Sequence, residues 1–366
     1  MTTLAAWLHT LDPVVVRISG ELAVRWYGLS YVAAFAIGWT LWKWLARRGV
    51  ALTPADRVGD AMLAVIVGTM VGGRLGYVLV YGPHLLTEFT ASPPFWGVLA
   101  LNKGGMASHG GMVGLMAAAW WVGRRFTAER AGDVGQVGAL RAGGAPATLH
   151  VMDMLALIAP PGLLLGRCAN FVNGELLGKI VSPPGVPGPW WSVQFPQELR
   201  GWEGPGVRDA LSHTPELSAD QQRVLVDLVE QVRLPSQSFA GGVERLIGRA
   251  GEHAAELAMI LSSRHPSQLY QAVAEGLVLG VVLWVIARRG RRPGVIAAWF
   301  FIVYGVLRVA TEFYRLPDPQ FGATMRIAGL SRGQWLSVGM VAFGAGLLGL
   351  VVTRAWPRGR GWGERP

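Results

Sequence analysis

The chain has 366 residues, of which 51% are hydrophobic and only 15% are charged, and its formal net charge is +10. Soluble domains carry roughly 25% charged residues, so this composition excludes an ordinary soluble protein. The positive charge does not indicate a nucleic-acid partner, because the basic residues gather in alternate loops beside apolar stretches. We therefore expect an all-α polytopic membrane protein, with the lipid bilayer and not nucleic acid as its surroundings.

Seven near-continuous apolar stretches follow one another along the chain. Each is close to the ~20 residues that a helix needs to cross a bilayer. Because lipid offers no hydrogen bonds to backbone groups, we expect about seven transmembrane helices. The stretches are 27–45, 60–82, 106–123, 151–172, 267–287, 294–314 and 334–353. Several of the 16 tryptophans lie at their ends, as in the aromatic belt of membrane proteins.

Basic residues mark the loops that follow the odd-numbered stretches. They are Lys43, Arg47, Arg48, Arg57, Arg124, Arg125, Arg130, Arg141, Arg288, Arg289, Arg291, Arg292, Arg354, Arg358 and Arg360. Under the positive-inside rule these loops are cytoplasmic, so the N-terminus is expected outside and the C-terminus inside. No removable signal peptide is expected, because a basic start and a small-residue cleavage site are missing.

The loops complete the expected organisation. It comprises an outer interfacial arm (1–26), four transmembrane helices (27–172), an extracytoplasmic head section (173–264), three further helices (265–354) and a cytoplasmic tail (355–366). In the head section, the part up to about 206 is typical of irregular structure or short strands. The stretch Ala219–Val232 has helical periodicity, with Ser218 as a candidate cap.

Polar faces interrupt two of the apolar stretches. Tyr304, Arg308 and Glu312 are four residues apart and Arg315 follows three later, so they share one helical face. Arg167, with Asn170 three residues on, forms a second such face. Such faces avoid lipid, and two arginines near the outer leaflet suit the phosphate of an anionic lipid. We expect Glu312 to pair with Arg308, and a purely structural ion pair between helices remains the alternative. For Arg74, helix packing and a site role are equally open.

His109 is a candidate base within the third stretch. A neutral imidazole accepts protons near pH 7, and Gly110 and Gly111 leave space for an approaching group. The alternative is a hydrogen-bonded core histidine. Tyr27 and Tyr31 share a face and are either interface anchors or part of the site.

Asn173, Gly174 and Glu175 predict a turn at a helix exit. Cys168 is interpreted as a packing residue. The sequence shows no zinc-binding spacing and no carboxylate cluster, so we expect no metal and no cofactor.

Taken together, these motifs resemble the prolipoprotein diacylglyceryl transferase family, in family order over about 25–322. The stretch 166–178, with the sequence GRCANFVNGELLG, is similar to the family signature. Four further motifs match, namely RWYG at 25–28, HGG at 109–111, HPSQLY at 265–270 and YGxxRxxxEFxR at 304–315.

The resemblance implies an enzyme of the bacterial inner membrane. It would transfer the diacylglyceryl group of phosphatidylglycerol to the lipobox cysteine of a preprolipoprotein signal peptide, forming a thioether and releasing glycerol phosphate. It implies that Arg167 and Arg308 face the lipid headgroup and that His109 is the base. Other positions implied as catalytic or headgroup-binding are Tyr27, Asn170, Asn173, Glu175, Gly178, Glu312 and Arg315.

Two points stay open. An arginine-lined field that lowers the pKa of the substrate thiol is an alternative to a histidine base. A lipid or anion transporter, with the arginines on a permeation path, is the alternative function, although we find no internal repeat of the kind common in transporters. The chain also departs from the family at Gln271, where a glutamate is usual.

Overall fold

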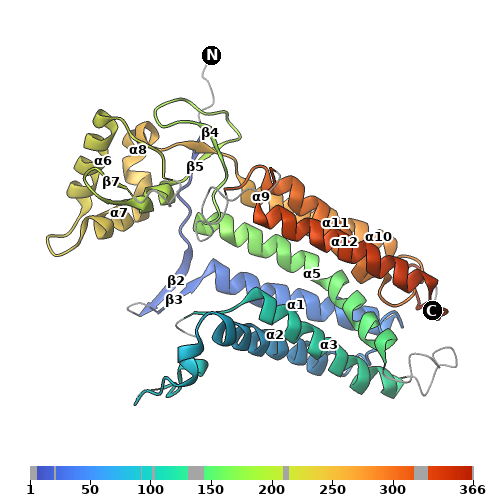
Figure 1. Cartoon of the computed structure of the whole chain (residues 1–366). Coiled ribbons are helices and arrows are strands. Elements are labelled where there is room, and N and C mark those ends of the chain that lie inside the picture. Colours follow the sequence, from blue (N-terminus) through green and yellow to red (C-terminus); the bar gives the residue numbers. More distant parts are fainter. Residues whose placement is uncertain are drawn as a thin grey trace. The chain divides into compact units, whose positions relative to one another are not determined.

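The computed structural model describes residues 6–19, 22–91, 93–100, 104–130, 144–208, 214–316 and 329–364 (Figure 1). The chain forms two compact units. The first unit comprises Met1–Ala34, Pro160–Leu279 and Val303–Val341, and the second comprises Phe35–Ala159, Gly280–Ile302 and Ala342–Pro366.

Long helices occupy all seven predicted apolar stretches. They are α1 (Trp26–Arg47), α2 (Val58–Val80), α3 (Ser108–Arg130), α5 (Ala145–Asn173), the continuous run Ser267–Ile286, α11 (Val295–Glu312) and α12 (Arg332–Thr353). Among the described residues, five are long and apolar enough to cross a membrane, namely α2, α5, Ser267–Ile286, α11 and Gly333–Thr353 of α12. The chain is thus mostly helical, as a polytopic membrane protein is.

Short strands correct the all-α expectation. The strands β1 (Trp7–Leu8), β5 (Val193–Gln194), β8 (Ser263–Arg264) and β4 (Ile180–Ser182) form a sheet in that order. A second pair, β6 (Trp202–Gly204) and β7 (Val207–Arg208), is antiparallel. The strands β4, β5 and β6 lie where the sequence analysis expected irregular structure or short strands. It expected no strand at β1 or β8, because two residues are too few to show an alternating pattern.

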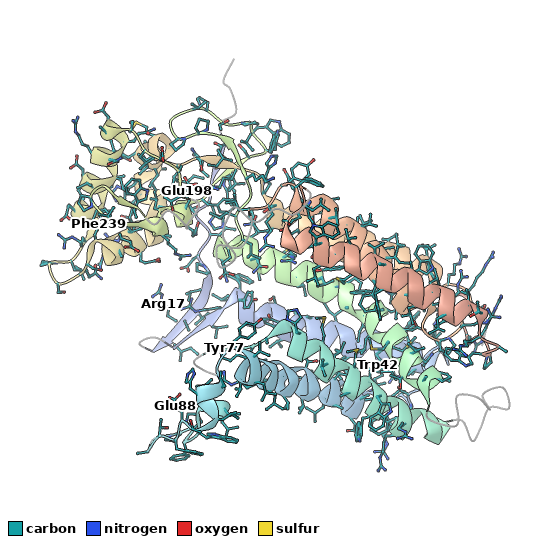
Figure 2. The ribbon with its side chains drawn as sticks, viewed as in Figure 1. Arg17, Trp42, Tyr77, Glu88, Glu198 and Phe239 are labelled. Carbon is teal, nitrogen blue, oxygen red and sulfur yellow. The ribbon has the colours of Figure 1, made fainter. Side chains whose placement is uncertain are left out.

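The predicted outer arm contains a β-hairpin. The strands β2 (Val14–Ser19) and β3 (Leu22–Arg25) pair antiparallel and lead directly into α1. Val16 and Ile18 are exposed on this hairpin, and Arg17 also belongs to β2 (Figure 2).

Three helices build the core of the head section. They are α6 (Ala219–Val232), α7 (Phe239–Gly248) and α8 (Ala254–Ile260), and they enclose buried side chains such as Leu225, Leu246 and Leu257. The predicted cap of α6 is confirmed. The Ser218 hydroxyl accepts a hydrogen bond from the Gln221 N–H, and the Gln221 side chain accepts one from the Ser218 N–H.

In the second unit, α2 and α3 lie side by side (Figure 1), and glycines of the two helices face each other. A Cβ atom on Gly72 would lie 2.4 Å from the Gly110 oxygen, and one on Gly110 would lie 2.2 Å from the Gly72 oxygen. One turn away, a Cβ atom on Gly114 would lie 2.0 Å from the Gly68 oxygen. Small residues four apart let helix backbones approach closely. The role of these glycines is therefore to allow close packing of α2 against α3.

Arg74 of α2 holds the loop that precedes α3. Its Nε donates to the Val98 oxygen at 2.7 Å, and Nη1 donates to the Gly104 and Gly105 oxygens at 2.5 and 2.9 Å. Nη2 donates to the Gly97 oxygen at 2.6 Å. The side chain is almost fully buried. These bonds favour the packing role over a role in a site.

Candidate functional site

The end of α5 places Arg167 and two asparagines together. The helix ends at Asn173, and Gly174 adopts a φ of 62°, the left-handed conformation typical of a helix C-terminus. Both Asn170 and Asn173 donate from Nδ2 to the Glu175 carboxylate, each at 3.3 Å. The predicted turn is therefore present, and it keeps Glu175 against the last turn of the helix.

Arg167 and Arg308 converge on one carboxylate, that of Glu275. Arg167 donates from Nε and Nη2 to Glu275 Oε2 at 3.1 and 3.0 Å. Arg308 donates from Nη1 to the other oxygen, Oε1, at 3.3 Å. Arg167 is also hydrogen-bonded to Tyr304. The structure thus brings together two arginines that are 141 positions apart in the chain.

The predicted pairing on α11 is confirmed. Arg308 Nη2 lies 3.1 Å from Glu312 Oε2, and Arg315 Nη1 lies 3.6 Å from the same oxygen. Glu312 therefore restrains the second edge of the Arg308 guanidinium. The side chains of Arg167 and Arg308 are partly exposed, whereas that of Glu275 is fully buried.

Glu275 was missed by the sequence analysis. It lies inside the apolar stretch 267–287 and belongs to a π-helical segment, Ala272–Val278, which continues α9 (Ser267–Gln271). A lone carboxylate in a stretch of this kind is itself a signal, because ionisable residues in membrane segments are commonly functional. The following residue, Gly276, packs against Leu164 of α5, where a Cβ atom would lie 2.4 Å from the Leu164 Cβ.

Gly178 lies where three backbone segments meet. It forms a bridge with Arg315, and Lys179 donates from its N–H to the Tyr314 oxygen at 2.9 Å. A Cβ atom on Gly178 would lie 2.0 Å from the His265 oxygen. This position therefore requires glycine for close packing of the loop that follows Arg167.

A buried ion pair in the first unit supports Gly178. Arg264 donates from Nη1 to the Gly178 oxygen at 3.1 Å and from Nε to Glu198 at 2.5 Å. Glu198 also accepts hydrogen bonds from the N–H and hydroxyl of Ser262, at 2.6 and 2.5 Å. Both charged side chains are essentially fully buried, and Glu198 lies inside the head section (Figure 2).

Tyr27 and Tyr31 form a pair at the start of α1. Their rings are 5.1 Å apart, and the Tyr31 hydroxyl donates to the Tyr27 hydroxyl at 3.2 Å. The expectation that they share a helical face is confirmed.

His109 belongs to the second unit, as the second residue of α3, and it is exposed. The space beside Gly110 that we expected for an approaching group is filled by α2, since Gly72 packs against it. Cys168 is partly buried and forms no disulfide. Among the described residues, no group of three or more His, Cys, Asp or Glu side chains could hold a metal ion.

The arrangement of the first unit is suited to an anion. Guanidinium groups donate paired, planar hydrogen bonds to phosphate oxygens. Arg167 and Arg308 are each held by ion pairs with carboxylates, and both side chains remain partly exposed.

Comparisons with known proteins agree with this chemistry. The family model described as "Prolipoprotein diacylglyceryl transferase" matches residues 13–350. A protein of Bdellovibrio bacteriovorus named "Phosphatidylglycerol--prolipoprotein diacylglyceryl transferase" is 38% identical over 368 residues, covering 96% of this chain and 97% of the relative. Proteins of the same name from Aromatoleum aromaticum and Ruegeria pomeroyi are 35% and 34% identical, covering 92% and 91% of this chain and 94% and 93% of the relatives.

These matches give the transporter alternative no support. The matched region contains Arg167, Arg308 and both of their carboxylate partners. The chain belongs to the prolipoprotein diacylglyceryl transferase family.

Proposed function

We propose that this chain transfers the diacylglyceryl group of phosphatidylglycerol to the thiol of the lipobox cysteine in a preprolipoprotein. The names of its relatives support this reaction. The structural observation that carries the proposal is the pair of partly exposed arginines, Arg167 and Arg308, whose guanidiniums are both held by Glu275. The pair fits the phosphate of the lipid headgroup.

The chemistry requires a thiolate and a stabilised leaving group. The sulfur attacks the glyceryl carbon that is bonded to the phosphate oxygen, and a carbon–sulfur bond forms as the carbon–oxygen bond breaks. The electron pair of that bond stays on the phosphate oxygen, and glycerol phosphate departs. Preorganised guanidiniums stabilise the charge that develops on the phosphate, which is the role we assign to Arg167 and Arg308.

The thiol proton needs an acceptor. We assign the role of proton acceptor to His109, an exposed imidazole at the start of α3. The alternative is a thiolate favoured by the positive field of the arginines themselves.

Other residues act on these groups. Glu312 restrains Arg308 and also contacts Arg315, so Arg315 contributes to headgroup binding through this network. We further assign headgroup or transition-state contacts to Tyr27, Asn170, Asn173 and Glu175. Gly178 serves the same site by allowing the loop after α5 to pack closely.

The proposed setting is the bacterial inner membrane. The long helices over the seven apolar stretches of the described residues, the basic loops after alternate helices and the apolar surfaces of the helices support a multi-pass arrangement. In this arrangement the N-terminus and the head section 173–264 are outside and the C-terminus is cytoplasmic.

A labelling experiment tests the function. Purified full-length protein is incubated with phosphatidylglycerol labelled in its glyceryl group and with a lipobox cysteine peptide, and label on the peptide is measured. Phosphatidylethanolamine replaces phosphatidylglycerol in a parallel reaction. Transfer from phosphatidylglycerol alone is expected, and an absence of transfer would refute the proposed function.

Substitutions test the site. Arg167→Ala and Arg308→Ala are each expected to lower kcat/KM by about 10²-fold or more, because each removes donors to the developing charge. Arg200→Ala is the control, since Arg200 forms a half-exposed ion pair with Glu244 in the head section. Full activity of both site variants would rule out the two-arginine phosphate site.

A further inference from the structure

The charged side chains around Glu275 form one connected network. Among the described residues, ion pairs link Arg167 to Glu275, Glu275 to Arg308, Arg308 to Glu312, and Glu312 to Arg315. With three guanidiniums and two carboxylates, the network carries one net positive charge when all five groups are ionised. That single charge balances a singly charged ligand.

The positive and negative side chains of this network differ in their exposure to a ligand. The side chains of Arg167 and Arg308 are 17% and 15% exposed, whereas that of Glu275 is 0% exposed. A ligand can therefore reach the exposed part of either arginine side chain but not Glu275, whose negative charge acts on it from behind this surface. Both Glu275 oxygens are occupied, each by a different arginine, so the carboxylate also sets the spacing between the two guanidiniums.

The local backbone directs Glu275 into this position. It lies within the π-helical turn Ala272–Val278, and such turns are frequent at functional sites. Gly276 permits contact with Leu164 on α5, the helix that carries Arg167. Close packing therefore fixes Glu275 opposite Arg167.

We infer that Glu275 is a positioning residue that sets the charge selectivity of the phosphate site, favouring a phosphodiester over a phosphomonoester. This inference rests on the proposed function. Phosphatidylglycerol is a phosphodiester with one negative charge. The glycerol phosphate released from it is a phosphomonoester with a charge between about −1.5 and −2 near pH 7.

The Glu275 carboxylate thereby makes the site discriminate between substrate and product in binding affinity. Electrostatic energy scales with the charge of the ligand, so the Glu275 charge opposes the phosphomonoester up to about twice as strongly as the phosphodiester. Glu275 lowers the affinity for the product more than that for the substrate, which favours product release.

Two soluble probes test this charge selectivity without turnover. One is glycerophosphoglycerol, the singly charged headgroup diester, and the other is glycerol phosphate. Equilibrium dissociation constants of both are measured on the full-length protein in detergent. For Glu275→Gln we expect the Kd of glycerol phosphate, divided by that of glycerophosphoglycerol, to fall about tenfold relative to wild type.

Two further variants separate charge from shape. Glu312→Gln removes one negative charge from the same network and is expected to lower the ratio in the same direction. Glu275→Asp keeps the charge, and its ratio is expected to stay near that of wild type even if kcat falls. Glu244→Gln, on the half-exposed surface pair of the head section, is the control.

The outcomes distinguish this inference from the proposed function. An unchanged ratio in folded Glu275→Gln overturns the inference, as does an equal shift in Glu275→Asp. If Glu275→Gln does not fold, the ratio for Glu312→Gln decides. A wild-type protein that transfers no label, yet shows the expected ratios, refutes the proposed reaction and leaves the charge selectivity standing.

Discussion

At the scale of single residues, Arg74 is a buried arginine with a structural role. Its guanidinium donates to backbone oxygens on both sides of the loop before α3, including those of Val98 and Gly105. The residue is only 5% exposed, so little water is available to replace these hydrogen bonds. The loop oxygens would therefore lose their partners if Arg74 were removed.

Arg74→Ala is expected to destabilise the protein by about 2–4 kcal/mol, because it leaves several buried carbonyl groups unsatisfied. The midpoint of thermal unfolding in detergent measures this change, and limited proteolysis should show earlier cleavage within 97–105. Arg57→Ala is the matched control, since the Arg57 side chain is 49% exposed. Equal unfolding midpoints for the two variants would contradict the structural role.

The candidate site shows what residue patterns reveal in advance. Arg167, Arg308 and Glu312 could be predicted because charges within apolar stretches stand out and because i, i+4 spacing places two of them together. Glu275 is also a charge within an apolar stretch and was overlooked. Its partners lie on two other helices, so no spacing along its own segment predicts the pairing. Gly178 was found through its motif, but its packing reason appears only in the fold.

At the scale of elements, the predictable part of the fold is the part governed by local rules. Helix lengths follow from the thickness of the bilayer, and the start of α6 follows from its Ser218 cap. Short strands were expected in the region of β4 and β5, but β1, β8 and the order of the sheet do not follow, because such short strands pair with segments distant in sequence. The π-helical turn at Ala272–Val278 likewise has no local signature that we recognised.

The contact between α2 and α3 predicts a strong effect of side-chain size. Gly110→Val would place its Cβ atom 2.2 Å from the Gly72 oxygen, so the two helices would have to separate. We expect a loss of about 3 kcal/mol or more, at the upper end of overpacking effects. Thermal unfolding and the yield of monodisperse protein measure it.

The matched control for this prediction is another helical glycine. A Cβ atom on Gly339 of α12 meets nothing within 4 Å, so Gly339→Val is expected to change stability little. A Gly110→Val variant as stable as Gly339→Val would show that the close approach of α2 and α3 is not required for folding.

At the scale of the whole molecule, His9 joins three distant parts of the first unit. Its Nε2 donates to the Phe171 oxygen at 2.8 Å at the end of α5, and its backbone N–H donates to the Gln194 oxygen at 2.9 Å in β5. Its ring packs against Phe171 and Phe195. The outer arm, α5 and the head section therefore meet at one buried imidazole, which is 1% exposed.

This placement predicts acid-sensitive stability. Burial lowers the pKa of His9 below its ordinary value of 6.5, because the charged form is poorly solvated there. The unfolded chain binds the proton more readily, so the stabilising contribution is complete above pH 6.5 and declines as the pH falls towards the folded-state pKa.

Unfolding midpoints of the full-length protein between pH 8 and 5 measure the effect. His9→Gln should lower stability at pH 8 and flatten this part of the pH dependence, whereas His84→Gln, at an exposed position, should keep the wild-type slope. A His9→Gln variant with an unchanged slope would assign the acid sensitivity to other groups.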